Sequence, residues 1–457
     1  MEKIQVIAVF DIGKTNKKVL LFDRHLKMVF QREDKFGTTT DEDGFECDDI
    51  VLIEEWIKNT LSDLVPSDKY DLQAVNFSTY GASLAFLDDQ GNRLTPIYNY
   101  LKEIDPAVQQ KLFEANGGQA EFCRRTASPA LGVMLNSGIQ ILWLKNHRPD
   151  IYKKVAHILH FPQYLSFVLS GQVTSESTSI GCHTFMWDFD HQDYHPWLSA
   201  TGVQLSRPLP NNHTIPVAIN GRKIVAGIGI HDSSASLAPY IKGSARPFLL
   251  ISTGTWCINM NPFNHTPLTA HQLDNDCLAY LSITQQPVKS SRLFMGHIHD
   301  VNTKRLTDFF KVDAQSYKKV SLDESLLKEY LHNRKPLFFE DGVPTDYVDE
   351  EVDLSQFESF AQAYHRLVFD LTLLNSQSID LISDENDGVQ QFYVSGGFAR
   401  NEIFVRLLAS FYPEKEVFTS QVDNASALGA ALVVLDTIAG ENIPEIDLGL
   451  KKWYSIS

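Results

Sequence analysis

Short apolar runs separated by polar turns fill the beginning of the chain and predict strands there. The first two should be joined by a turn at Asp11–Asn16, and a helical pattern over Asp49–Leu64 precedes a further strand. The predicted strands are Ile4–Phe10, Lys17–Phe22, Lys27–Glu33 and Leu72–Ser78. Because helices alternate with strands after this opening meander, the pattern predicts an α/β fold.

The same succession begins again near the middle of the chain. Phe248–Ile251 is an apolar strand, Ser252–Thr255 is a polar turn, and Trp256–Met260 resembles a second strand. Asp11 and Ser252 each stand two residues before a glycine. Two similar halves would bring these two turns to one cleft, although a strand, a glycine turn and a strand also describe any β-hairpin.

The remaining pattern is mainly helical. A capping box of Ser355 and Glu358 should begin a long helix, and Asp423 or Asn424 should cap the last one. The predicted helices are Gly132–Asn146, Pro149–His157, Gln356–Ile382, Asn401–Phe411 and Ala425–Thr437, with a strand at Phe392–Val394. The repeat places the domain boundary near Pro239–Arg246, which predicts domains 1–240 and 241–457.

Charge and cysteine content narrow the functional classes. With 40 Lys and Arg against 57 Asp and Glu among 457 residues, the net charge of −17 repels nucleic acid and anionic membranes. No apolar run reaches the ~18 residues of a membrane-spanning helix, and no secretory signal is recognisable. Five cysteines without a Cys-x-x-Cys pair are typical of reduced thiols, so a cytoplasmic protein is expected.

The two glycine turns have the composition of phosphate-binding loops. In the first, backbone N–H groups and lysines can hold phosphate while Asp11 holds hydrated Mg²⁺. Its candidate residues are Gly13, Lys14, Thr15, Asn16, Lys17 and Lys18; those of the second turn are Thr253, Gly254 and Thr255. Taken alone, each sequence would also suit an ordinary hairpin turn.

A single acid, Asp232, lies in a glycine-rich and otherwise apolar stretch after the strand Lys223–Ala226. A carboxylate there can accept the proton of an attacking hydroxyl. It can also cap a helix over Ser233–Leu237, and both roles are compatible. His231 is expected to position or pack, and Gly396 with Gly397 either approaches a flat ligand or forms a simple turn.

Taken in order, these segments resemble the FGGY family of carbohydrate kinases, within the superfamily of actin, Hsp70 and sugar kinases. The resemblance runs nearly from end to end. It rests on Asp11–Lys18, Ser78–Gly81, His231-Asp232, Ser252–Thr255, Ser395–Asn401 and Ala427–Ala431. The family implies two ribonuclease H-like domains that face a central cleft.

The resemblance also implies a site and its cofactors, ATP and Mg²⁺. ATP would contact the two turns together with Gly396, Gly397 and Asn401. Asp232 would be the catalytic base, and Asp11 and Asp232 would reach Mg²⁺ through water. The sugar would contact Thr79, Tyr80, Gly81, Asn136, His231 and Asp232.

Within the family, the similarity is greatest to the branch of rhamnulokinases and fuculokinases. His231-Asp232, Thr253–Trp256 and Asn136-Ser137 match that branch. Ser83 stands where these kinases often have Asp, and Leu293 where rhamnulokinases have Asn. These departures affect which sugar hydroxyls the site would recognise, and they affect ATP binding less.

The sequence therefore predicts a kinase that phosphorylates a small sugar, an L-rhamnulose-like or L-fuculose-like ketose, at its C1 hydroxyl. One rival is a kinase of another ketose or polyol such as xylulose. The other is a non-catalytic ATPase switch like actin or Hsp70. The expected partner is the small-molecule sugar alone, with the chain a monomer or homodimer.

Overall fold

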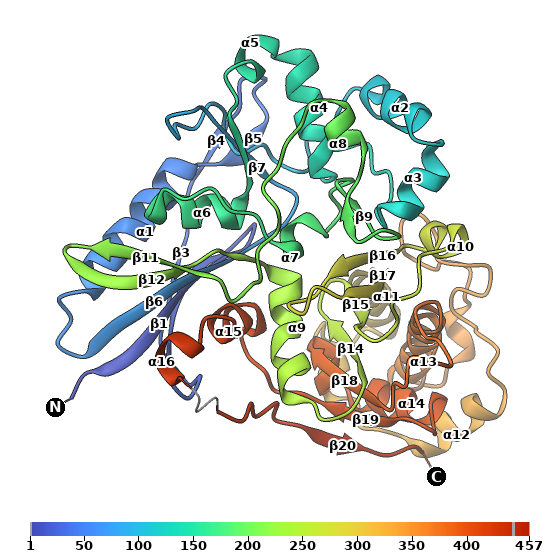
Figure 1. The fold of residues 1–457 in the computed structure, drawn as a ribbon. Helices are drawn as coiled ribbons and strands as arrows, with labels where there is room; N and C mark the ends of the chain where they lie inside the picture. The colour runs from blue at the N-terminus through green and yellow to red at the C-terminus, as the bar shows by residue number, and fades with distance from the viewer. Residues whose placement is uncertain (1, 441–443, 457) are drawn as a thin grey trace.

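The computed structural model describes residues 2–440 and 444–456 and contains two large β-sheets, one in each half of the chain (Figure 1). The strands of the first sheet are β1 (Ile4–Ile12), β2 (Lys17–Asp23), β3 (Met28–Asp34), β6 (Tyr70–Thr79), β11 (Thr214–Ile219), β12 (Arg222–Gly227) and β13 (Ile230–His231). Those of the second are β14 (Phe248–Thr253), β15 (Cys257–Asn261), β16 (Cys277–Leu281), β17 (Pro287–Leu293), β18 (Gln391–Gly396), β19 (Glu416–Thr419) and β20 (Lys451–Trp453).

The two sheets share one topology. The first contains the order β12-β6-β1-β2-β3, and the second contains β19-β18-β14-β15-β17. In each sheet, one strand (β1 or β14) has an antiparallel pair on one side, β2-β3 or β15-β17, and two strands joined in parallel on the other, β6-β12 or β18-β19. The predicted repeat and the α/β class are therefore confirmed.

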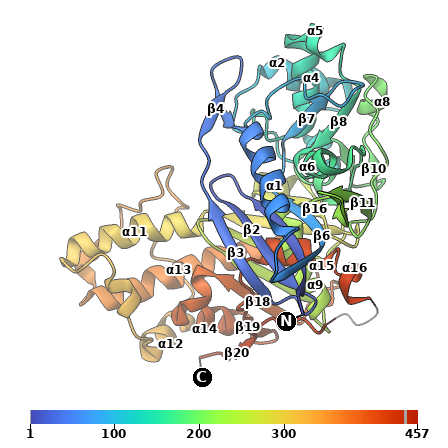
Figure 2. The ribbon, with the colours of Figure 1, turned by 90° about the vertical axis from the view of Figure 1, so that its left-hand side faces the viewer.

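Helices surround both sheets (Figures 1 and 2). In the first half they are α1 (Ile50–Leu64), α2 (Pro106–Ala115), α3 (Gln119–Arg125), α4 (Ser137–His147), α5 (Pro149–Tyr152), α6 (Phe161–Ser170), α7 (Ser177–Ile180), α8 (Trp197–Ala200) and α9 (Asp232–Gly243). In the second half they are α10 (Ala270–Asp274), α11 (Met295–Phe310), α12 (Glu324–His332), α13 (Phe360–Asp380), α14 (Glu402–Phe411), α15 (Ala425–Leu432) and α16 (Asp436–Ala439). Three two-stranded sheets complete the first half: β4 (Thr38–Thr40) with β5 (Glu46–Asp48), β7 (Leu84–Leu87) with β8 (His157–His160), and β9 (Trp187–Asp188) with β10 (Asp193–Tyr194). Short 3₁₀ turns lie at Ser316–Lys319, Leu354–Gln356 and Gly397–Arg400 of the second half.

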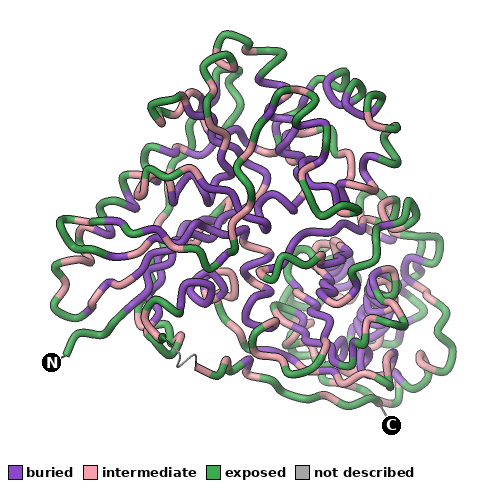
Figure 3. Tube along the Cα trace, viewed as in Figure 1, coloured by how far each residue is buried: buried purple, intermediate pink, exposed green. Residues whose placement is uncertain are grey.

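The apolar core follows the two sheets, as the buried central strands in Figure 3 show. The side chains of β1 from Val6 to Phe10 are fully buried because helices cover both faces of its sheet. Around the second sheet, the core is built on the apolar face of α13 and on α14. Each half thus has its own core.

Two helices join the halves. The predicted domain boundary falls inside α9, which continues to Gly243, and α15 from the second half packs on α9, β1 and β6. The crossing is close, because a Cβ at Gly429 would lie 1.8 Å from the carbonyl oxygen of Ala235. The boundary at 240 stays a prediction, since the chain passes between the halves along a continuous helix.

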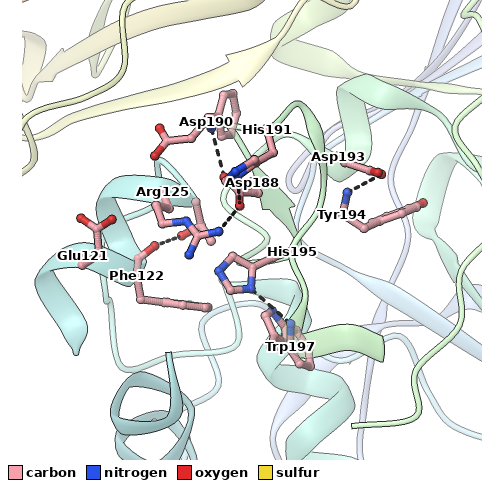
Figure 4. A network of polar contacts seen from close by, with 12 residues as sticks. Glu121, Phe122, Arg125, Asp188, Asp190, His191, Asp193, Tyr194, His195 and Trp197 are labelled. Carbon is pink, nitrogen blue, oxygen red and sulfur yellow. Dashed lines mark hydrogen bonds and ion pairs between the residues drawn. The ribbon is translucent and has the colours of Figure 1, made fainter. Parts of the chain in front are cut away.

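A second contact between the halves begins at α3. Arg125 forms an ion pair with Asp188, which ties α3 to the β9–β10 hairpin (Figure 4). Arg124 also contacts Asp190 at 2.6 Å. Just beyond α3, the carbonyl oxygen of Ala127 accepts a hydrogen bond from the N–H of Ala279 in β16 at 3.3 Å. This backbone bond places the loop after α3 against the edge of the second sheet.

Several predicted helix ends were wrong for local reasons. Ser359, whose hydroxyl accepts from the N–H of Gln362, caps α13, whereas Ser355 belongs to a 3₁₀ turn capped by Asp353. The predicted helix over Pro149–His157 stops at Tyr152, and His157 begins β8. Other differences are that α4 begins at Ser137 and that the last predicted helix is divided into α15 and α16.

Candidate functional site

The first glycine turn joins β1 to β2 at the carboxyl end of β1. The N–H of Gly13 donates to the carbonyl oxygen of Asn16 at 2.9 Å, which closes the turn. Asp11 lies opposite Lys18 on β2 and opposite Ser78 on β6. The parallel pairing of β1 with β6 thus brings the turn beside the predicted sugar segment.

Asp11 is a buried acid next to the predicted base. Burial and the negative charge of Asp232 raise the pKa of Asp11 to about 6, against the opposing hydrogen bond from Ser426. Ser426 belongs to α15, in the second half of the chain, and its hydroxyl donates to the Asp11 carboxylate at a distance of 3.0 Å. Asp11, Asp232 and α15 therefore meet at one place.

Strand β13 positions His231, its last residue, and Asp232, which follows it, beside Asp11. Ile230 pairs with Ser78 and His231 with Thr79, so both strand ends lie at the same edge of the sheet as Asp11. Asp232 is the first residue of α9, whose N-cap is His231, and the prediction that Asp232 caps the helix was wrong. Because the carboxylate is not engaged in capping, it can accept a proton from a ligand.

The surroundings of Asp232 match those of a base. Its carboxylate contacts the hydroxyl of Ser233 at 3.2 Å and Nε2 of His231 at 3.3 Å, and about a third of the side chain (34%) is exposed. No lysine or arginine within residues 2–440 and 444–456 forms an ion pair with it. A Cβ at Gly81 would lie 2.8 Å from the ring of His231, so only glycine leaves room for the histidine there.

Four predicted contact residues are engaged in structural bonds. Lys17 is buried and donates to the carbonyl oxygen of Lys14 and to Asp48. The hydroxyl of Tyr80 donates to Asp48 as well, and the hydroxyl of Thr79 donates to the carbonyl oxygen of Tyr80. These side chains support the turn and the sugar segment from behind.

Asn136 is the fourth. It is fully buried, and its amide donates to the carbonyl oxygens of Pro129 and His183 at 3.2 and 3.0 Å. It therefore joins two loops of the first half instead of presenting its amide to an open pocket. Lys14 and Lys18 are half-buried at the turn, and the ammonium group of each has one partner, Asp48 and Asn424 respectively.

The second glycine turn has the equivalent position in the other half. Ser252 pairs with Ser395 and Thr253 with Gly396, so β14 and β18 repeat the arrangement of β1 and β6. The hydroxyl of Thr253 donates to the carbonyl oxygen of Ser395 and accepts from the N–H of Phe398 at 3.0 Å. Gly396 has a φ of 84°, and a Cβ there would lie 1.8 Å from the carbonyl oxygen of Thr253.

A cavity of about 790 Å³ opens beside this second turn. Gly254, Thr255, Gly397 and Asn401, all predicted nucleotide contacts, line it. No heavy atom lies within 4 Å of the position that a Cβ of Gly397 would occupy, so the glycine faces open space. The size and shape suit a bound cofactor or small ligand.

Several residues of the cavity wall were missed by the sequence prediction: His299, Asp300, Tyr317, Lys318, Lys319, Tyr364, Phe398 and Arg400. Their hydrogen bonds form a chain. The ring of His299 contacts Asp300 and the hydroxyl of Tyr364, both at 3.0 Å, and Tyr364 accepts from the amide of Asn401 at 3.1 Å. Because Tyr364 matches the apolar periodicity of α13, its pattern indicates core packing and gives no sign of a cavity.

His160 is a buried histidine near His231, and its pKa makes the stability of the protein depend on pH. Burial and, second, His231 lower the pKa of His160 to about 3. The ring of His160 contacts the hydroxyl of Ser137 at 3.1 Å. A histidine in the unfolded chain has a pKa near 6.5. Between pH 6.5 and pH 3, the unfolded chain therefore binds a proton at His160 that the folded chain does not bind. The free energy of unfolding consequently falls as the pH drops through this range.

His160→Gln should therefore flatten the acid side of the stability profile. At pH 8 the variant is expected to be less stable than the wild type, because packing is lost. At pH 5 the gap should shrink by about 2 kcal/mol, the value of about 1.5 pKa units. Urea unfolding of both proteins at the two pH values measures the gap, and a gap independent of pH would contradict the burial of a neutral imidazole.

Comparison with known proteins adds to this geometry. The model of the FGGY family of carbohydrate kinases, N-terminal domain, matches residues 6–225, and that of the carbohydrate kinase FGGY, C-terminal domain, matches residues 245–442. This chain belongs to the FGGY family of carbohydrate kinases. The two matched segments of this family member lie on either side of α9.

Two curated relatives indicate the branch. A rhamnulokinase of Yersinia pestis (strain Pestoides F) is 29% identical over 284 residues, and an L-fuculokinase of Haemophilus influenzae is 25% identical over 298 residues. The alignments cover 58% and 57% of this FGGY chain, and 56% and 58% of the relatives. The chain thus matches somewhat more than half the length of each.

Solved structures agree on the fold. A carbohydrate kinase from Novosphingobium aromaticivorans has a TM-score of 0.81 at 24% identity, over 100% of this chain and 95% of that one. A xylulose kinase from Lactobacillus acidophilus has a TM-score of 0.77 at 15% identity, over 99% and 94%. The FGGY chain therefore has the two-domain fold of sugar kinases, as predicted. Among its described residues, no helix is both long and apolar enough to span a membrane.

Proposed function

We propose that the chain is a cytoplasmic, ATP-dependent sugar kinase in which Asp232 deprotonates the hydroxyl that attacks the γ-phosphorus. The observation that carries this proposal is the position of Asp232 at the first residue of α9, with no lysine or arginine paired to it in the described structure and the acid Asp11 beside it. A carboxylate in this position can accept the hydroxyl proton as the oxygen–phosphorus bond forms and the bond to ADP breaks.

The two glycine turns would hold the triphosphate from opposite sides. Lys14 and Lys18, with the backbone N–H groups of the first turn, offer positive charge, and Gly254 and Thr255 offer uncharged donors. The adenosine would occupy the cavity that Gly397 and Asn401 line. Most of the catalysis in such a site is positioning and charge stabilisation.

Mg²⁺ is compatible with the chemistry of the residues present. Asp11 and Asp232 offer carboxylate oxygens. Burial and, second, the negative charge of Asp232 raise the pKa of Asp11, and a divalent cation would offset the repulsion between the two carboxylates. Within the described structure, no group of three His, Cys, Asp or Glu side chains is arranged for a metal, so phosphate oxygens and water would complete the set. Bound there, Mg²⁺ would neutralise charge on the phosphates.

We propose a ketose as the acceptor, phosphorylated at C1, with L-rhamnulose or L-fuculose favoured by the two curated relatives. Xylulose remains the alternative, since xylulose kinases have the same fold at 15% identity. Ser83, where an acid is common in the deoxyketose branch, is buried beside the carbonyl oxygen of Tyr98, so this position supplies no carboxylate to the sugar.

A panel of sugars tests the proposal. Coupled ADP release with D-xylulose, L-rhamnulose, L-fuculose, aldoses and polyols should be fast with one ketose and slow without sugar. A non-catalytic ATPase switch would instead release ADP at a rate that no sugar changes. Asp232 favours the kinase, because a switch has no use for a base beside a sugar pocket.

A further inference from the structure

Asp48 is a buried carboxylate that three side chains bind at once. Lys14 donates to one oxygen at 3.0 Å, Lys17 to the other at 2.8 Å, and the hydroxyl of Tyr80 donates to the first at 2.7 Å. Only 5% of Asp48 is exposed. Burial raises the pKa of its carboxyl, but the donors from Lys17, Tyr80 and Lys14 outweigh burial and hold this pKa below its usual range.

The three donors come from two functional segments. Lys14 and Lys17 belong to the first phosphate turn, and Tyr80 belongs to the sugar segment, directly before the Gly81 that packs on His231. Asp48 itself comes from a third segment, the end of β5, just before the cap of α1. It is therefore a bridge between the turn and the sugar segment.

The bridge extends to the half-buried ammonium group of Lys14. Lys14 lies over the rings of Tyr80 and Tyr100, 5.7 and 6.0 Å from their centroids, and 27% of its side chain is exposed. Burial and, second, the charge of Asp232 raise the pKa of Tyr100, which places Tyr100 within electrostatic reach of the base. A shift of Tyr80 would thus move both the carboxylate that holds Lys14 and the ring beneath it.

A purely structural role for Asp48 is the simpler explanation, because a buried lysine such as Lys17 needs a counter-charge. That role requires only Lys17 and Asp48. It does not require the Tyr80 hydroxyl, which could be satisfied by water or by a backbone carbonyl, nor the second lysine. The convergence of donors from both segments is what distinguishes a bridge from a local ion pair.

We propose that Asp48 is a positioning residue that couples the sugar site to the phosphate turn, so that a bound sugar sets the position of Lys14 for the triphosphate. This inference rests on the proposed function. Because such a coupling is reciprocal, the sugar should raise nucleotide affinity by the same factor by which the nucleotide raises sugar affinity.

The test uses calorimetry to measure how tightly the protein binds AMP-PNP, a non-hydrolysable analogue of ATP, in the presence of Mg²⁺. The dissociation constant is measured with and without saturating ketose. The ketose is whichever of D-xylulose, L-rhamnulose and L-fuculose gives the fastest ADP release. In the wild type it should tighten AMP-PNP binding by about 5-fold or more, the lower end of typical couplings. In Tyr80→Phe, which removes the hydroxyl that contacts Asp48, this factor should fall below about 2-fold.

Tyr70→Phe is the matched control, because it removes a hydroxyl bonded to Val29 at the other end of β6, which ends beside Tyr80. It should keep the wild-type factor. Asp48→Asn should also lose the coupling, but it can unfold the turn around Lys17, so Tyr80→Phe decides.

A wild-type factor of 1, or an unchanged factor in Tyr80→Phe, would overturn the inference while leaving the kinase intact. If none of the three ketoses accelerates the release of ADP by the protein, the proposed function is wrong. The bridge is then judged without sugar: Tyr80→Phe should weaken AMP-PNP binding about 3-fold or more while Tyr70→Phe does not, and equal affinities would overturn it.

Discussion

Asp232→Asn is expected to lower kcat by about 10³-fold while the affinity for MgATP changes little. The amide has the shape of the carboxylate but cannot accept the hydroxyl proton. Asp232 begins α9 without capping it, and in the described structure its carboxylate has polar contacts only with His231 and Ser233, so the substitution removes few structural bonds. Steady-state kinetics with the best ketose, together with nucleotide calorimetry, measure both quantities.

The control for this variant is Asp63→Asn, an equally conservative change at an exposed position on α1. It should retain wild-type kcat and melting temperature. If Asp232→Asn keeps most of the wild-type kcat, Asp232 is not the base. If it loses nucleotide binding as strongly as turnover, the residue acts through the nucleotide instead.

Gly397→Val is the second substitution with a large expected effect, on the KM for ATP. The glycine lines the cavity of about 790 Å³ with open space where a Cβ would stand, so valine fits the unliganded protein but fills part of the site. We expect KM for ATP to rise about 10- to 100-fold, from the ~1–3 kcal/mol that inserted methyl groups cost in a filled site. The KM for sugar should change much less.

Two further glycine substitutions separate this effect from misfolding. Gly37→Val is the matched control at an exposed glycine with open space around it, and it should leave both KM values unchanged. Gly396→Val should instead lower the melting temperature, because its φ is 84° and its Cβ would overlap the carbonyl oxygen of Thr253. A parallel rise in both KM values for Gly397→Val would indicate general damage and contradict the adenosine assignment.

The fold was predictable because it repeats. Asp11 and Ser252 each end an apolar strand two residues before a glycine, and both lie where a hairpin strand and a parallel strand flank the first strand of their half. Strand periodicity and turn chemistry depend on neighbouring residues alone, so they are visible in one sequence. The order of the six segments from Asp11–Lys18 to Ala427–Ala431 then indicated the family.

The supporting residues were not predictable in the same way. Asp48 stands directly before the helix cap Asp49, and its three donors come from 31 to 34 residues earlier and 32 residues later in the chain. Ser426 reaches Asp11 across 415 residues. Contacts of this kind depend on tertiary packing, which overrides the local pattern.

The prediction that Asp232 caps a helix had a similar cause. The sequence predicted a helix that begins at Ser233 with Asp232 as its cap. In the structure, β13 ends at His231, which pairs with Thr79, and His231 is the residue that precedes the helix. The helix therefore begins at Asp232 itself. This shift leaves the carboxylate available for chemistry.

The central claim is that the γ-phosphoryl of ATP goes to a sugar hydroxyl, and the products of the reaction test it most directly. Phosphorus NMR of the protein with MgATP and each of D-xylulose, L-rhamnulose and L-fuculose should show a sugar monophosphate growing in step with ADP for at least one ketose. Without sugar, ADP should form slowly. Inorganic phosphate that accumulates at one rate with and without every sugar would contradict the account and identify an ATPase.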